Sequence, residues 1–234
     1  AIVTVADDGG SSGRIRSELG IPPPGDIRNT LVALANTEPL MEQLFQYRFD
    51  WGEGLEGHSF GNLFIAAMTD ITGDFEEAIR TSSQVLAVRG QVLPSTLTSV
   101  TLRAEYVDGS TTIGESLIPR SGKVISRLQL EPKDCEPVEE AIDAIGNADA
   151  IILGPGSLYT SVLPNLLVRG IRDAIRKSSA TKIYICNVMT QAGETDGYKA
   201  SDHVRALLDH VGPGLIDYVI VNTAPIPDKL LERY

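Results

Sequence analysis

Four short segments of the chain concentrate residue types that bind phosphate groups, metal ions or sugars. Residues 7–13 read Asp-Asp-Gly-Gly-Ser-Ser-Gly, and residues 154–157 read Gly-Pro-Gly-Ser. A third segment surrounds His58, and a fourth begins at Asn187. Glycines, hydroxyls, amides and carboxylates do chemistry only when the fold brings them together, so the position of each segment in the fold decides its role.

The segment 154–157 follows an apolar run and precedes an expected helix. Its glycines let the backbone approach an anion, and a helix N-terminus supplies N–H groups and a positive dipole. Ser157, Thr160 and Ser161 can donate further hydrogen bonds. The segment therefore predicts a phosphate site, and the alternative is a tight turn whose hydroxyls only cap the helix. It matches neither a P-loop nor the Gly-x-Gly-x-x-Gly pattern.

The acidic pair Asp7-Asp8 could hold Mg²⁺, contact a ribose or act as a general base. Neighbouring residues at a strand end point to opposite faces, so we expect one carboxylate to enter a cleft. We take Asp8 as the candidate catalytic residue and candidate Mg²⁺ ligand; the alternative is that Asp8 only forms a turn with Gly10. Arg14 and Arg28 are candidate phosphate partners, with ordinary surface ion pairing as the alternative.

The segment 57–62 reads Gly-His-Ser-Phe-Gly-Asn and precedes an expected helix. His58 could serve there as an acid, a base or a hydrogen-bond donor. Asn62 could face a ligand, because it is a polar residue in an otherwise apolar helix start. The alternative is a helix cap with a structural histidine.

Composition narrows the classes of function. The 234 residues include 20 Lys and Arg against 31 Asp and Glu, which gives a formal net charge of −11. Nucleic acids and anionic membranes both require clustered cations, so we expect no nucleic-acid partner and no membrane insertion. The two cysteines are too few for a disulfide scaffold, and we expect a cytoplasmic protein.

Short apolar runs alternate with helical patterns, which predicts an α/β fold with a Rossmann-like, three-layer, doubly wound, mostly parallel sheet. We expect a single domain over 1–234, a β-rich insertion at 91–131 with a hairpin turn at Asp108-Gly109, and a loop at 7–13. The expected strands are 2–6, 91–93, 98–106, 111–118, 124–130, 149–153, 182–186 and 217–221, and the expected helices are 26–36, 39–48, one that begins at 59 or 61, 74–88, 137–147, 165–177, 201–211 and 230–234.

In an open parallel sheet, ligands bind beyond the carboxyl ends of the strands. Four expected strand ends carry glycines, hydroxyls, amides or carboxylates, so we expect them to form one site. The candidate ligand-binding residues are Asp7, Asp8, Gly9, Gly10, Ser11, Ser12, Gly13, Arg14, Arg28, Asn29, His58, Asn62, Gly154, Pro155, Gly156, Ser157, Thr160, Ser161, Asn165, Asn187, Gln191 and Asn222.

With these motifs the chain resembles the bacterial gluconeogenesis-factor family. The resemblance rests on collinear segments at 3–13, 57–63, 154–166, 186–191 and 193–197, and it spans essentially the whole chain. The broader superfamily includes 2-phospho-L-lactate transferase of coenzyme F420 synthesis. Long collinear motifs make a resemblance more specific than any single short pattern.

The resemblance implies a cytoplasmic, Rossmann-like protein that binds nucleotide sugars such as UDP-glucose or UDP-N-acetylglucosamine. It also implies a link to cell shape and envelope synthesis during growth on gluconeogenic carbon sources. The transferase side of the superfamily uses an Asp near the Asp7-Asp8 position, together with Mg²⁺, to transfer a phospholactyl group. The family has an earlier strand and a glycine-rich turn, so we expect both upstream of Ala1.

Three hypotheses follow. The first is a nucleotide-sugar-binding regulator, working as a homo-oligomer with regulatory protein partners. The second is a Mg²⁺-dependent transferase similar to 2-phospho-L-lactate transferase, with Asp8 at its centre. The third is a scaffold whose β insertion at 91–131 docks a partner.

Overall fold

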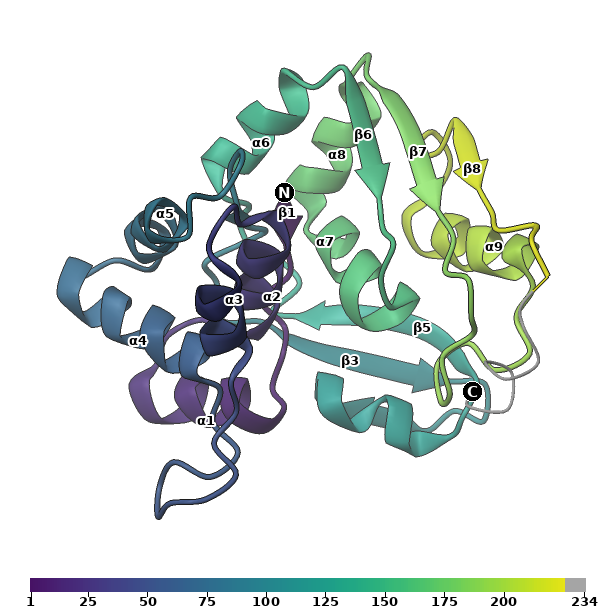
Figure 1. The fold of residues 1–234 in the computed structure, drawn as a ribbon. Coiled ribbons are helices and arrows are strands. Elements are labelled where there is room, and N and C mark those ends of the chain that lie inside the picture. The colour runs from purple at the N-terminus through teal and green to yellow at the C-terminus, as the bar shows by residue number, and fades with distance from the viewer. Residues whose placement is uncertain (226–234) are drawn as a thin grey trace.

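Parallel strand pairs form the framework of the molecule. The computed structural model describes residues 1–225. Strand β1 (Ile2–Val3) pairs in parallel with β2 (Leu93–Pro94). A second parallel sheet has the order β6 (Ala150–Leu153), β7 (Thr181–Ile185) and β8 (Tyr218–Ile220). The predicted α/β class with parallel pairing is confirmed (Figure 1).

The first third of the chain is helical and packs around a core of its own. Ile27, Leu31, Phe45, Ile65 and Ile79 are buried together there. Apolar residues at helical spacing give each helix one face that must be covered, which explains this packing. The helices are α1 (Gly10–Leu19), α2 (Gly25–Leu34), α3 (Pro39–Gln46), α4 (Phe60–Thr72) and α5 (Phe75–Val85).

Helix α1 corrects the loop predicted for residues 7–13. The chain becomes helical at Gly10, so the glycine- and serine-rich segment forms the first turn of a helix. Ile15 anchors this helix in the interior, and Gly20 ends it with a φ of 69°. Gly20 adopts this left-handed conformation without steric cost, which is why it can terminate the helix. Polar and glycine-rich residues favour a loop locally, but here Ser11 and Ser12 are buried by contacts with His58 and Asn62.

The antiparallel part of the molecule is a small sheet with the order β4-β3-β5. Its strands are β3 (Thr101–Tyr106), β4 (Thr111–Ile113) and β5 (Ile125–Glu131). The predicted turn at Asp108-Gly109 is confirmed, because β3 and β4 pair across it and Gly109 has a φ of 81°. The strand predicted at 111–118 ends at Ile113, and the chain continues in two 3₁₀ turns.

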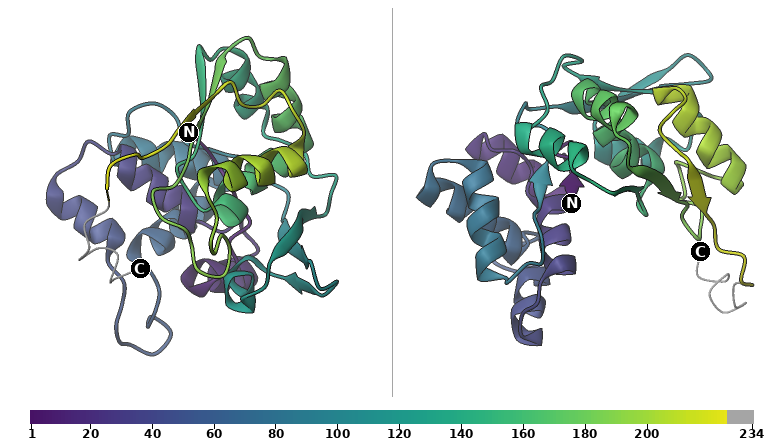
Figure 2. Two further views of the ribbon diagram at one scale, coloured as in Figure 1. Left: turned by 90° about the vertical axis from the view of Figure 1, so that its right-hand side faces the viewer. Right: turned by 90° about the horizontal axis from the view of Figure 1, so that it is seen from above.

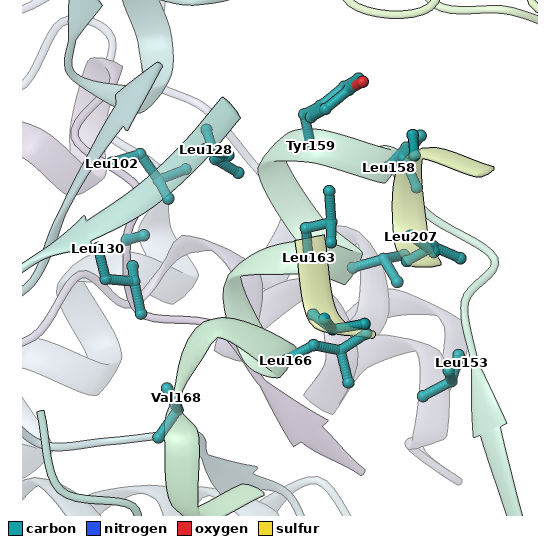
Figure 3. Packing of buried hydrophobic residues seen from close by; sticks show 14 of the residues in the cluster. Leu102, Leu128, Leu130, Leu153, Leu158, Tyr159, Leu163, Leu166, Val168 and Leu207 are labelled. Carbon is teal, nitrogen blue, oxygen red and sulfur yellow. The ribbon is translucent and has the colours of Figure 1, made fainter. Parts of the chain in front are cut away.

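The remaining helices surround the largest core, which Figure 3 shows from close by. They are α6 (Glu139–Gly146), α7 (Leu163–Leu167), α8 (Arg169–Lys177) and α9 (Ala200–Val211), with a π-helical turn at Leu158–Val162 before α7.

The single helix predicted at 165–177 is wrong in its start and in its continuity. Helical structure already begins at Leu158, and Val168 separates α7 from α8. Pro164 is tolerated inside this stretch because it lies in the first turn of α7, where its missing N–H has no intrahelical partner.

One face of the β6-β7-β8 sheet carries exposed apolar side chains. Ile152 and Tyr218 both pair with Ile183, and Ile220 pairs with Ile185. Ile152, Tyr218 and Ile220 are each more than half exposed. Among the described residues, helices therefore cover only the opposite face of this sheet, where Tyr184 is buried.

The two halves of the molecule lie on opposite sides of β1. Figures 1 and 2 show α1–α5 on one side and β6–β8 with α9 on the other. The antiparallel strands β3 and β5 run below α7 and the β6–β8 sheet in Figure 1. Within residues 1–225, no helix is long and apolar enough to cross a membrane. The helix predicted at 230–234 lies outside the described residues.

Candidate functional site

A groove of about 540 Å³ lies between β1 and β6. Each of these strands pairs on one side only among the described strands, with β2 and β7 respectively. The strands, α6 and α8 supply apolar lining residues. Asp26, Asn29, Thr30, Ser161 and Asn165 supply polar ones, together with the turn at 154–156. The groove thus joins an apolar slot to polar groups at the strand ends, where the sequence predicted a site.

Asn187 fixes the glycine turn that closes one end of the groove. Its Oδ1 accepts a hydrogen bond from the Gly156 N–H at 3.1 Å, and its Nδ2 donates to the Gly156 carbonyl at 2.8 Å. Gly154 has a φ of 81°, and a Cβ there would lie 2.9 Å from the Ile185 carbonyl oxygen. Close packing against β7 therefore requires glycine at position 154. Hydrogen bonds therefore join the turn after β6 to Asn187, which follows β7.

A polar network continues from this turn into the loop after β7. Ser157 donates to Gln191, and Gln191 Nε2 donates to Glu194 Oε1 at 2.7 Å. Thr160 Oγ1 also donates to Glu194 Oε1, at 3.1 Å. Glu194 is 4% exposed, and burial raises its pKa. Glu194 lies in the collinear segment 193–197 but is not among the predicted site residues, because the sequence does not show that its side chain is buried.

The two neighbouring carboxylates of the first segment have different partners. Both oxygens of Asp8 accept backbone N–H groups, from Glu115 at 3.1 Å and from Ser116 at 2.9 Å. Asp7 accepts from the Gly9 N–H at 2.8 Å. Asp8, the candidate catalytic residue, therefore anchors the turn that follows β4. Asp7 instead lies near the carboxyl groups of Asp26 and Glu115.

Asp7 belongs to an acidic centre that also contains Asp26 and Glu115. Burial and the Asp7 carboxylate raise the pKa of Asp26 to about 6. Burial raises the pKa of Glu115 to about 8, and Asp7, Asp26, Asp8 and Glu194 add to this effect. At neutral pH Glu115 is therefore mostly protonated and Asp26 mostly ionised, which is the kind of difference that acid–base chemistry requires.

His58 and Asn62 join α4 to α1 instead of facing open space. Ser11 Oγ accepts from the Ser59 N–H at 3.2 Å and is hydrogen-bonded to His58 Nδ1 at 3.1 Å. Asn62 Nδ2 donates to Ser12 Oγ at 3.3 Å. His58 and Asn62 are buried, at 6% and 2% exposed. This geometry favours the structural alternative stated for the 57–62 segment.

Residues 57–61 also match the spacing of a Gly-x-Ser-x-Gly nucleophile motif. Ser59 is completely buried, and its hydroxyl donates to the Phe45 carbonyl at 3.5 Å. A Cβ at Gly61 would lie 2.6 Å from the same carbonyl oxygen. The segment therefore serves close packing of α4 against α3, and Ser59 does not reach a substrate.

Three arginines, Arg14, Arg28 and Arg48, lie beside the acidic centre. Arg14 donates to the Glu56 carbonyl at 2.7 Å, and Arg48 donates to the Gly57 carbonyl at 2.6 Å. Arg28 donates to Asn29 Oδ1 at 2.7 Å. Burial lowers the pKa of Arg28 and the Arg48 charge lowers it further, whereas Asp26 and Asp7 oppose this effect. This mutual repulsion between cations would be relieved by an anion such as a phosphate.

The other predicted residues fall into three groups. The glycines at 9, 10 and 13 shape the start of α1, and a Cβ at Gly13 would lie 2.0 Å from the Asp8 carbonyl oxygen. Asn165 donates to the Ser161 carbonyl at 2.8 Å, and both residues line the groove. Within residues 1–225, the exposed Asn222 bonds only with Ala224, and no described contact links it to the polar network.

Comparisons with known proteins agree along the full chain. A family model described as 2-phospho-L-lactate transferase CofD matches residues 1–234. A gluconeogenesis factor from Halalkalibacterium halodurans is 61% identical over 234 residues, which cover 100% of this chain and 73% of that protein. Gluconeogenesis factors from Bacillus subtilis and Listeria monocytogenes are 59% and 48% identical and cover 100% and 99% of this chain, and 74% and 72% of their own length.

Solved structures show the same fold. A crystal structure of a UPF0052 family member from Bacillus halodurans has a TM-score of 0.96 and 61% identity. The match covers 100% of this chain and 75% of that one. A second X-ray structure from that organism gives a TM-score of 0.97. The resemblance inferred from the collinear motifs is confirmed by these matches.

Proposed function

The chain belongs to the 2-phospho-L-lactate transferase CofD family, and on that premise we propose that it binds a nucleotide sugar of the UDP-N-acetylglucosamine or UDP-glucose type. The diphosphate would lie at the turn 154–157, and the rest of the ligand would extend into the groove beside α2. Relatives called gluconeogenesis factors support a role in growth on gluconeogenic carbon sources. We extend the proposal to a cytoplasmic, homo-oligomeric regulator of cell shape and envelope synthesis.

The observation that carries this proposal is the Asn187–Gly156 pairing at the edge of the groove. It pairs with both backbone groups of Gly156 and thereby holds the turn 154–157 in one conformation. A preorganised turn before a helical segment is suited to phosphate oxygens. Thr30 and the exposed Asn29 lie on α2, on the other side of the same groove, and the Arg28 cation is hydrogen-bonded to Asn29. These groups offer charge and hydrogen bonds to an anionic, polar ligand.

The acidic centre favours a second function, group transfer, which is also the chemistry named in the family description. Glu115 and Asp26 have pKa values of about 8 and about 6, on either side of neutrality. Such a pair could hold and release a proton at a bound hydroxyl or phosphate. We keep transfer as the alternative, with Glu115 and Asp26 ahead of Asp8 as its acid–base groups.

A bound Mg²⁺ would require more than these carboxylates. Among residues 1–225, no group of three or more His, Cys, Asp or Glu side chains is close enough to hold a metal ion. In addition, both carboxylate oxygens of Asp8 accept hydrogen bonds from backbone N–H groups. The side chains that are present therefore do not form a metal site by themselves, and we assign no step to a metal ion.

The deciding experiment is calorimetric titration of the full-length protein with UDP-N-acetylglucosamine, with and without Mg²⁺, followed by product analysis of the same sample. Binding with intact ligand supports the regulator, and binding with a consumed or transferred sugar supports the transferase. Absence of binding for UDP-N-acetylglucosamine and UDP-glucose would refute the nucleotide-sugar proposal. Deazaflavins and phosphorylated acids would then be the next ligands.

The scaffold hypothesis is tested separately. A pull-down with the chain lacking 98–130 would lose its partners if the insertion docks them. The same deletion removes the buried core residues Leu102 and Leu128, so the decisive outcome is a pull-down that is indifferent to the deletion, which would count against the scaffold hypothesis.

A further inference from the structure

A second cavity, of about 310 Å³, lies between β5, α8 and α9. None of the strand ends or motif segments of the candidate site lines it. It is notable in a chain of net charge −11, because cations dominate its lining. Its charged or titratable lining residues are Arg127, Lys133, Arg169, Arg172, Asp209 and His210.

The cations of this cavity are largely uncompensated. Within residues 1–225, Arg127, Lys133 and Arg169 form no ion pair. Arg172 approaches Asp173 at 3.5 Å. Asp209 is the one carboxylate in the lining. Four cations around one small cavity repel one another, and an anion with several charges removes that repulsion.

Backbone groups add donors to the same cavity. Strand β5 is an edge strand, and its Leu128 N–H points outward and donates to His210 Nε2 at 2.9 Å. N–H directions alternate along a strand, so the N–H of Leu130 points to the same edge. Both leucines line the cavity. Helix α8 begins beside it without a side-chain cap and without an acidic residue in its first turn.

We propose that this cavity binds a small polyphosphate anion, of which inorganic pyrophosphate is the simplest, at a place separate from the groove between β1 and β6. Arg169 and Arg172 are three residues apart on α8 and present their charges on the same side. Arg127 and Lys133 approach from β5 and from the segment after it. The anion would connect the β3–β4–β5 sheet, which carries Glu115 to the acidic centre, with α8.

The test is calorimetric titration of the full-length protein with inorganic pyrophosphate in metal-free buffer. The test variant combines Lys133→Gln with Arg169→Gln, because both side chains are exposed and neither makes a described ion pair. The matched control combines Arg89→Gln with Lys177→Gln, which removes the same charge at exposed positions outside the cavity. We expect the test variant to bind about tenfold more weakly than the control.

An Asn187→Ala variant separates this site from the candidate nucleotide site. Binding that survives Asn187→Ala and weakens in the Lys133→Gln, Arg169→Gln variant supports the proposal. The proposal is overturned if the wild type binds no pyrophosphate, or if the test and control variants give the same affinity. It is also overturned if Asn187→Ala alone abolishes all binding, and none of these results refutes nucleotide-sugar binding.

Discussion

The carboxylate of Asp8 accepts the backbone N–H of Glu115, a residue 107 positions further along the chain. The same carboxylate accepts the Ser116 N–H, so it caps the turn after β4. This contact attaches the antiparallel sheet to the segment that follows β1. It also places the Glu115 side chain near Asp7 and Asp26. A residue that looks catalytic in the sequence thus positions Glu115, whose pKa is raised to about 8.

Asp8→Asn should destabilise the fold and displace Glu115. The amide has one acceptor oxygen, so one of the two N–H groups loses its partner, at a cost of about 1–2 kcal/mol. Urea unfolding measures this loss, and Asp134→Asn, at an exposed position without described contacts, is the control. Equal stabilities of the two variants would show that the Asp8 contacts contribute nothing.

Asn187→Ala should weaken nucleotide-sugar binding by about tenfold, because the Gly156 N–H and carbonyl both lose their partner and the turn loosens. Asn187→Asp retains an acceptor for the N–H and loses the donor to the carbonyl, so an intermediate affinity is expected. Titration calorimetry gives both values, with the exposed Asn147→Ala as control. An unchanged affinity in Asn187→Ala would place the ligand elsewhere.

Glu115 should make the protein less stable as the pH rises. Its pKa is about 8 in the folded chain and 4.5 for an unperturbed glutamate, so the folded state binds more protons between these values. Stability therefore falls from pH 4.5 toward pH 8. Glu115→Gln should flatten this dependence in urea unfolding at several pH values, whereas Glu53→Gln, in an exposed loop, should leave it unchanged. A steeper decline in Glu115→Gln would contradict the assignment.

His210, in contrast, should make the protein less stable as the pH falls. Its Nδ1–H donates to the Ala206 carbonyl at 2.7 Å, so the Nε2 that accepts from Leu128 must be unprotonated. Burial lowers the pKa of His210 and Arg127 adds to this, although the Ala206 contact and Asp209 oppose it. The unfolded state thus binds more protons, and stability falls as the pH drops below about 6.5.

His210→Gln keeps an acceptor for Leu128 and does not titrate, so it should reduce this acid sensitivity. Thermal unfolding from pH 5 to 8 measures the effect. His58, whose pKa burial and then Arg14 also lower, should supply the acid sensitivity that remains. An identical pH profile in the wild type and His210→Gln would rule out the contribution of His210.

Local patterns in the chain were sufficient for the α/β class, for the hairpin at Asp108-Gly109 and for the glycine turn at 154–157. Each of these depends on residues close in sequence, such as a β-branched run or a glycine that permits positive φ. The collinear motifs were likewise enough to identify the family. The same reasoning failed for α1, whose polar first turn is buried by contacts with α4 about 50 residues away.

The roles of single side chains depended on the assembled fold. Asp7 and Asp8 are neighbours of the same type, and only long-range contacts decide that Asp8 caps a turn and that Asp7 joins an acidic centre. Glu115 lies outside every motif segment, Glu194 lies within the segment 193–197, and the raised pKa of each comes mainly from burial. Burial and charge proximity arise when distant segments pack, so no local pattern can encode them.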